Sequence, residues 1–137
     1  MNDLSPQLDP VHLAVVRLPA GWQPPPIPGN AFTAVVSSEV EVTVVCAEAM
    51  LDDNGWSSEA VQVDIGWRRI TFPGPLPWEL VGFLADVASR LASAQIPFTS
   101  VSGFTTDHVL VRAAQADLAV FVLSGQEPPP QRPGTNP

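Results

Sequence analysis

Lysine is absent from this 137-residue chain, and positive charge of any kind is scarce. The six basic residues are all arginines and stand against fourteen acidic ones, so the formal net charge is −8 at pH 7. A field of that sign repels a phosphate backbone unless the arginines form a local patch, and the adjacent pair Arg68 and Arg69 is the nearest candidate. The composition therefore argues against nucleic acid as a partner.

Cysteine is nearly absent too, because Cys46 is the only one. A single cysteine cannot form an internal disulfide, and its place in the apolar run VTVVCAEAM is typical of a small buried hydrophobe. The chain also lacks the apolar run of about 18 residues that a membrane helix needs. Its first residues, MNDLSPQLDP, lack the basic start and apolar core of a signal peptide. We therefore expect a cytoplasmic protein with no membrane partner.

Histidine is limited to His12 and His108. Neither has a second histidine or a cysteine at ligand spacing, so no metal site is expected. Asp107 lies beside His108 and follows Ser100 and Ser102, which invites a comparison with a Ser-His-Asp triad. Adjacent residues of a strand point to opposite faces, however, so this aspartate cannot easily orient this histidine. We expect no catalytic residue, no cofactor and no enzymatic activity.

What the chain does contain is enough apolar material for a core. Apolar residues make up 45% of it and charged residues 15%, which predicts a folded chain of ordinary domain size. The ends differ from the middle. Residues 126–137 hold five prolines and no large apolar side chain, so we expect a disordered proline-rich tail. Residues 1–10 are expected to form a flexible N-terminus.

The first half of the chain alternates strand-like runs with turn-forming segments. VHLAVVRL, residues 11–18, is β-branched and predicts a strand, and the PAGWQPPPIPGN that follows contains five prolines, which exclude a regular helix. Residues 31–37 and 40–46 predict a hairpin, because valine recurs at every second position of the latter run. Residues 47–60 predict a short helix that ends at a turn cluster.

The second half begins with a predicted strand at residues 61–72, whose register Gly66 should disturb. LPWELVGFLADVASRLASAQ, residues 76–95, gives the strongest helix signal, because its leucines and valines recur at helical spacing. Residues 98–103 and 107–112 predict two further strands. A helix and two paired strands therefore follow the first strand of this half.

AAQADLAVFVL, residues 113–123, predicts a short helix that passes into a final strand near Val120 to Leu123. The first half gives the same order of elements, with the proline-rich connection in place of its first helix. Two such units predict an α+β fold of tandem ferredoxin-like βαββαβ units, with helices on one face of an antiparallel sheet. The units would span residues 11–60, with a degraded first helix, and residues 61–125.

GWRRITFPGPLPWELVGFLADVASRLASAQIPFTSVSGFTTDHVLVR, together with SSEVEVTVVC upstream, resembles the ACT domain. The resemblance is to the small tandem-ACT proteins related to the eukaryotic cytosolic arginine sensors, and it covers residues 11–123. It implies that both units are ACT domains and that an amino-acid-sized cleft lies between modules.

The resemblance also implies which residues border that cleft. Carried over by position, they are Gly74, Gly82, Phe83, Phe104, Thr106 and Asp107. We add Gly103 to this ligand-binding set, although the family usually has threonine there. His108 departs from the family as well, because an aromatic residue is usual at that position. Both departures bear on the identity of the ligand more than on the fold.

A free amino acid carries an ammonium and a carboxylate on one carbon, so its site needs an anionic acceptor and backbone N–H donors. Asp107 is the candidate acceptor. The loop at residues 73–77 leads into the long helix, whose first N–H groups favour a carboxylate. Two simpler interpretations stay open. Asp107 can close a turn through its side chain, and Gly82 can serve helix packing alone.

The sequence thus predicts a non-catalytic sensor module that binds a small amino acid. A ligand held across a seam would stabilise one packing or one oligomer, and exposed sheet edges make a homodimer the expected assembly. The alternative is a protein-interaction or structural module that has the ACT fold without a ligand. It would act through its sheet edge or its proline-rich tail.

Overall fold

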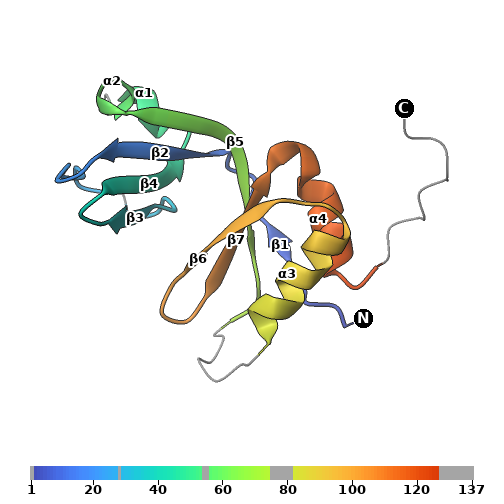
Figure 1. The fold of residues 1–137 in the computed structure, drawn as a ribbon. Coiled ribbons are helices and arrows are strands. Elements are labelled where there is room, and N and C mark those ends of the chain that lie inside the picture. The colour runs from blue at the N-terminus through green and yellow to red at the C-terminus, as the bar shows by residue number, and fades with distance from the viewer. Residues whose placement is uncertain (1, 28, 54–55, 75–81, 127–137) are drawn as a thin grey trace. The chain divides into compact units, whose positions relative to one another are not determined.

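The computed structural model describes residues 2–27, 29–53, 56–74 and 82–126. The chain divides into two compact units. The first unit comprises Asp9–Arg69 and Arg112–Ala114, and the second comprises Met1–Leu8, Ile70–Val111 and Gln115–Pro137. Each contains antiparallel strands and helices (Figure 1). The predicted α+β class is therefore confirmed.

The described residues of the first unit form four antiparallel strands and two short helices. Across the sheet the strands are β3 (Ala34–Ser37), β4 (Glu41–Ala47), β2 (Leu13–Pro19) and the first part of β5 (Gln62–Thr71). Helices α1 (Met50–Asp53) and α2 (Trp56–Glu59) follow β4. Strands β3 and β4 form the predicted hairpin, with Ala34 opposite Val45 and Ser37 opposite Val42.

Alternation along β2 and β4 builds the core of this unit, because every second side chain of a strand points to the same face. The register places three buried pairs directly opposite one another: Ala14 and Cys46, Val16 and Val44, and Leu18 and Val42. Cys46 therefore occupies the place of a core hydrophobe, as predicted. Burial raises the pKa of its thiol to about 11, so the thiolate needed for nucleophilic chemistry does not form at neutral pH.

Strand β5 contains the irregularity that the sequence predicts at Gly66. The pairing of β2 with β5 shifts register between Leu13 and Val15. Gly66 has a φ of +86°, a left-handed conformation that glycine adopts without steric cost. Its N–H donates to Oε1 of Glu48 at 2.8 Å. A single glycine thus lets β5 bend while its freed backbone group finds an acceptor.

The second unit packs longer helices against its strands. Its elements are β1 (Gln7–Leu8), the end of β5, α3 (Phe83–Ser93), β6 (Phe98–Ser102), β7 (Asp107–Arg112) up to Val111, and α4 (Ala116–Leu123). The 3-10 helix η1 (Ala113–Gln115) begins in the first unit and ends in the second. Strands β6 and β7 form a hairpin, and β1 pairs with residues 70–71 of β5. Helices α3 and α4 pack against each other, and α4 contacts β1 (Figure 1). The core lies among Ile70, Val87, Leu91, Val109, Val111, Ala119 and Leu123.

Arg90 of α3 anchors the N-terminal segment to this unit. Its side chain is only 4% exposed and forms an ion pair with Asp86 one helical turn earlier, at 2.9 Å. Its Nη1 donates to the carbonyl oxygens of Asn2 at 2.6 Å and of Leu123 at 3.2 Å. The buried charge is thus matched by a carboxylate and two carbonyls, as burial of a cation requires. One side chain therefore connects α3, the end of α4 and the start of the chain.

The N-terminal segment corrects one expectation. A flexible N-terminus was predicted, whereas residues 2–10 make hydrogen bonds and apolar contacts with the folded chain. Gln7 and Leu8 form β1, and the N–H of Leu4 donates to the carbonyl of Leu123 at 3.1 Å. Leu4 and Leu8 pack against the core of the second unit. These contacts offset the ordering entropy that composition alone suggested would dominate.

The last described helix, α4, corrects a second expectation. Residues 120–123 belong to α4, so the final strand predicted near Val120 to Leu123 is wrong. Burial of Ala116, Ala119 and Leu123 follows a helical spacing, whereas a strand would bury every second residue. The β-branched Val120 and Val122 gave the misleading signal.

The two compact units are not the two ACT-like units that the sequence predicts, which would meet between residues 60 and 61. The chain changes unit inside β5, between Arg69 and Ile70. The first turns of the helix predicted at residues 76–95 and the tail predicted at 126–137 lie outside the described residues, apart from Gln126. None of the helices described is long and apolar enough to cross a membrane.

Candidate functional site

Four of the seven predicted ligand residues share the turn that joins β6 to β7. The N–H of Gly103 donates to the carbonyl of Thr106 at 2.7 Å, which closes the turn. Phe104 lies within it and is 80% exposed. A Cβ on Gly103 would lie 3.1 Å from Oγ1 of Thr106, tighter than ordinary contact. A larger residue at position 103 would therefore require the Thr106 side chain to shift.

Asp107 is held in place at the end of this turn. Ser102 and Asp107 are register partners in the hairpin, and Oγ of Ser102 donates to Oδ1 of Asp107 at 2.6 Å. His108 contacts a different neighbour, with its Nε2 3.2 Å from Oγ1 of Thr106. The aspartate and the histidine thus have separate partners, as the alternation of strand side chains predicts.

The glycine before α3 has a role that the sequence did not reveal. Gly82 has a φ of +89° and immediately precedes α3, so its interpretation as a glycine inside a helix is wrong. A Cβ at Gly82 would meet nothing within 4 Å. Its left-handed backbone, rather than a close approach by a neighbouring segment of the chain, therefore explains the residue type. Its carbonyl accepts the N–H of Asp86 at 2.8 Å, which starts the helix.

The remaining predicted residues flank the loop before α3. Phe83 is half-buried and packs edge-on against Phe72, with ring centroids 5.0 Å apart. Gly74 is exposed and is the last described residue before the loop. The N–H donors expected near the predicted helix start belong to residues 75–81, which lie outside the described residues. The structure therefore brings Gly103, Thr106 and Asp107 together, and places Phe83 at the start of α3.

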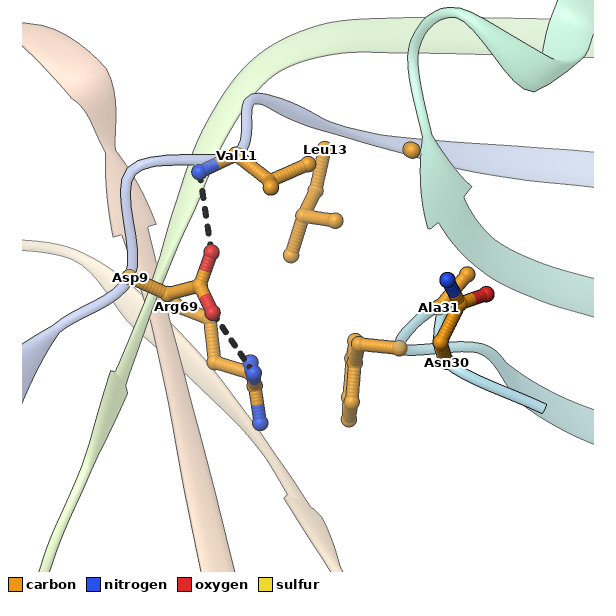
Figure 2. A pocket seen from close by; sticks show the side chains of 8 residues that line it. Asp9, Val11, Leu13, Asn30, Ala31 and Arg69 are labelled. Atoms are coloured by element: carbon orange, nitrogen blue, oxygen red, sulfur yellow. Dashed lines mark hydrogen bonds and ion pairs between the residues drawn. The ribbon is translucent and has the colours of Figure 1, made fainter. Parts of the chain in front are cut away.

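A pocket in the first unit was not predicted. It has a volume of about 220 Å³ (Figure 2). Its lining residues are Asp9, Val11, Leu13, Asn30, Ala31, Phe32, Ala47 and Arg69. They come from the segment before β2, from β2 itself, from the residues that precede β3, from the end of β4 and from β5. Most of the wall is aliphatic or aromatic, and the charge is confined to Asp9 and Arg69.

Those two charges form an ion pair, with Nη2 of Arg69 2.8 Å from Oδ2 of Asp9. Oδ1 of Asp9 accepts the N–H of Val11 at 2.9 Å (Figure 2). Burial raises the pKa of Asp9, but the Val11 N–H and the guanidinium groups of Arg69 and Arg68 outweigh it and lower the pKa overall. Asp9 is therefore ionised at neutral pH.

The arginine is held from its other side by an aromatic ring. Cζ of Arg69 lies 4.4 Å from the centroid of the Phe32 ring, within the range of a cation–π contact. Sequence analysis singled out Arg68 and Arg69 as a pair of charges, but it gave no signal that Asp9, sixty residues away, would meet Arg69. Such a contact depends on the register of β5.

A second charged cluster in the first unit is more open. Arg112 donates through Nη1 and Nη2 to the two carboxylate oxygens of Asp64, each at 2.8 Å, and its Cζ lies 4.1 Å from the Trp67 ring centroid. The hydrogen bonds from Arg112 lower the pKa of Asp64. Both side chains are more than two-fifths exposed, so the pair is screened by solvent. Among the described residues, no group of three metal-ligating side chains is found.

Comparison with known proteins agrees with this architecture. Residues 62–125, from the start of β5 to just beyond α4, match the ACT domain family. No curated protein matches the chain in sequence. The structure is similar to that of protein Atu0741 from Agobacterium tumefaciens, with a TM-score of 0.70 and 26% identity over 84% of this chain and 82% of that one.

Two further solved structures share the fold at lower identity. A Vibrio cholerae protein of unknown function, VC0802, described as a possible transport protein, has a TM-score of 0.68 and 20% identity, over 90% of this chain and 89% of that one. The regulatory subunit of aspartate kinase from Thermus thermophilus has a TM-score of 0.62 and 11% identity, over 90% and 97% of the two chains. The fold is thus the ferredoxin-like fold of ACT domains.

Proposed function

We propose that this chain is a non-catalytic regulatory module that binds a small amino acid. Asp107 carries the proposal. Its carboxylate is fixed by Ser102 at the first residue of β7, within residues 62–125, which match the ACT domain. It is only half-buried, so it remains within reach of a ligand. A fixed carboxylate at the end of a strand suits the ammonium group of an amino acid.

The ligand would contact the residues proposed from the sequence: Gly74, Gly82, Phe83, Gly103, Phe104, Thr106 and Asp107. Its carboxylate would face the N–H groups of the first turn of α3, where the helix dipole favours negative charge. Binding would stabilise the liganded packing by linkage, and a homodimer of tandem units would turn that stabilisation into a change of assembly. The fold shared with an aspartate kinase regulatory subunit is consistent with such a role.

Calorimetric titration with each of the standard amino acids tests the proposal. One of them should release or absorb heat with the wild type, and Asp107→Asn should abolish that signal because it removes the acceptor charge while preserving shape. Asp117→Asn, at an exposed position of α4, removes a charge from the same unit and should bind normally. Equal binding by both variants would refute this site.

The alternative is a protein-interaction module, and one observation favours it. Phe104 is an aromatic residue with 80% of its surface exposed at the tip of the β6–β7 turn, a position typical of an interface anchor. Sedimentation of wild type and Phe104→Ser would test this. A shift of the wild-type assembly towards monomer in the variant, without any amino-acid response, would favour interaction over sensing.

A further inference from the structure

The Asp9–Arg69 pocket has no part in the proposed site at Asp107, and its charged groups are unusually well fixed. Around Asp9, the backbone N–H donates to the carbonyl of Arg69 at 2.9 Å. The carbonyl of Asp9 accepts Nε and Nη2 of Arg68 at 3.1 and 2.9 Å. The Val11 N–H then orients the carboxylate itself. Its position is therefore set before any ligand arrives, which reduces the entropy cost of binding.

The guanidinium of Arg69 is equally constrained, by Asp9 on one side and by the Phe32 ring on the other. The pair still reaches the surface, because the Arg69 side chain is 19% exposed and that of Asp9 is 27% exposed. Figure 2 shows the two side chains together at one side of an open space, with Asn30 and Ala31 at the other. A ligand can therefore approach both charges from the same direction.

The balance of charge restricts what such a ligand can be. A simple anion would meet Arg69 but would also be repelled by Asp9, and a simple cation would meet the opposite conflict with Arg69. A zwitterion satisfies both groups, because its ammonium faces the aspartate while its carboxylate faces the guanidinium. Two charge-assisted contacts are thus added beside the ion pair that holds the two side chains in place.

The size and lining of the pocket restrict the ligand further. Its volume of about 220 Å³ is below the range of roughly 300–1,000 Å³ that is usual for drug-sized ligands. Around the charged pair, Val11, Leu13, Ala31 and Ala47 provide an aliphatic wall. The space thus suits a compact molecule with a small apolar body.

We propose that the Asp9–Arg69 pocket is a second ligand site, which binds a zwitterionic amino acid with a small aliphatic side chain. The first unit supplies every residue of it. The site is independent of Asp107, so the two sites can fail or succeed separately.

Analogue titrations test the charge requirement directly. L-alanine and L-valine are the probes, and each is compared with its N-acetyl derivative, which is only an anion, and its amide, which is only a cation. At least one free amino acid should bind, with a dissociation constant lower by about tenfold or more than those of both of its derivatives. Equal binding of the three forms, or no binding of either free amino acid, would overturn the proposal.

Variants then locate the binding. Arg69→Gln removes the guanidinium that would bind the carboxylate of the ligand. Ala47→Leu fills the pocket without changing its charge. Each variant should weaken binding by about tenfold or more. Arg17→Gln is the matched control, because Arg17 pairs with Glu41 in the same unit but does not line this pocket. Circular dichroism checks the fold of each variant, and Ala47→Leu keeps the test decisive if Arg69→Gln unfolds.

The variant Asp107→Asn distinguishes this pocket from the Asp107 site, because it should leave the binding of the amino-acid probe to the pocket unchanged. Loss of binding in Asp107→Asn with retention in Ala47→Leu would contradict the second site and favour the first. In an ¹⁵N-labelled sample, the amide signals of Val11, Ala31 and Ala47 should shift when the probe is added. Shifts confined to the β6–β7 turn would contradict the pocket.

Discussion

The two units cover their strands in different ways, and the difference accounts for the accessible pocket in the first unit. The second unit packs α3, α4 and the N-terminal segment around one core. Among its described residues, the first unit has the four-residue helices α1 and α2. A proline-rich connection stands in the place of the first helix of a ferredoxin-like unit, as predicted. Val61 and Ile65 there are more than half exposed. A sheet can thus keep its pairing with fewer helices, while leaving apolar side chains and a pocket accessible.

The largest expected contrast is in the cores. Leu91 of α3 is fully buried, whereas Leu51 of α1 retains 8% exposure at the margin of the first core. Leu91→Ala should lower the free energy of unfolding by about 3–5 kcal/mol, and Leu51→Ala by about 2 kcal/mol, because a looser site relaxes around the cavity. Urea denaturation measures both. Equal losses would mean that the two units are packed alike.

A second contrast concerns two arginines. Arg90→Ala should cost about 3 kcal/mol, because it removes a buried cation that satisfies Asp86 and two backbone carbonyls. Arg17→Ala should cost at most about 1 kcal/mol, since Arg17 and Glu41 are 51% and 38% exposed.

Amide hydrogen exchange distinguishes the loss of the Arg90 anchor from a general loss of stability. In Arg90→Ala the amide of Leu4 should exchange faster than global unfolding allows, because its segment loses an anchor. If that amide instead exchanges only through global unfolding in both proteins, Arg90 does not hold the N-terminal segment.

The glycine before α3 should respond to conformation rather than to volume. Gly82→Ala should cost about 1–2 kcal/mol because its φ of +89° disfavours a Cβ. Gly82→Asn should cost less, since asparagine tolerates the left-handed region. Thermal unfolding of the two variants compares them directly, and an asparagine variant less stable than the alanine variant would contradict the conformational explanation.

The smallest expected effect is the pH dependence contributed by Asp9. Its pKa in the folded chain lies below the ordinary value of 3.8. The hydrogen bond from the Val11 N–H and the ion pair with Arg69 therefore contribute stability that is fully present above that value and is lost as the pH falls through the lower, folded pKa. Asp9→Asn should flatten the acid limb of the stability curve. Superimposable acid limbs would show that the pocket charges do not stabilise the fold.

Local chemistry explains which parts of the fold the sequence could predict. Short stretches of sequence were enough to predict three features. Alternating apolar residues predicted the hairpin of β3 and β4 and the strand β2, and a glycine inside a strand predicted the bulge at Gly66. The helical state of residues 120–123 was missed because their β-branched side chains favour a strand in isolation. Tertiary packing of Ala119 and Leu123 decides in favour of the helix.

The candidate sites show the same limit. Sequence and resemblance indicated Asp107, which the structure fixes through its neighbour Ser102 in the hairpin. They gave no indication of the pocket, because Asp9 and Arg69 meet only after the strands have paired. Gly82 lay between these cases, since the sequence singled it out as a ligand-binding or packing residue but did not reveal its left-handed conformation.

Native mass spectrometry tests the central claim, that this module binds small amino acids, most directly. The wild-type chain, incubated with a mixture of the standard amino acids, should carry a mass increment of one of them. That increment should be absent when Asp107→Asn and Arg69→Gln are combined, and present in the paired control of Asp117→Asn with Arg17→Gln. A folded wild-type chain that carries no amino acid at any concentration tried would contradict the account and leave a protein-interaction module in its place.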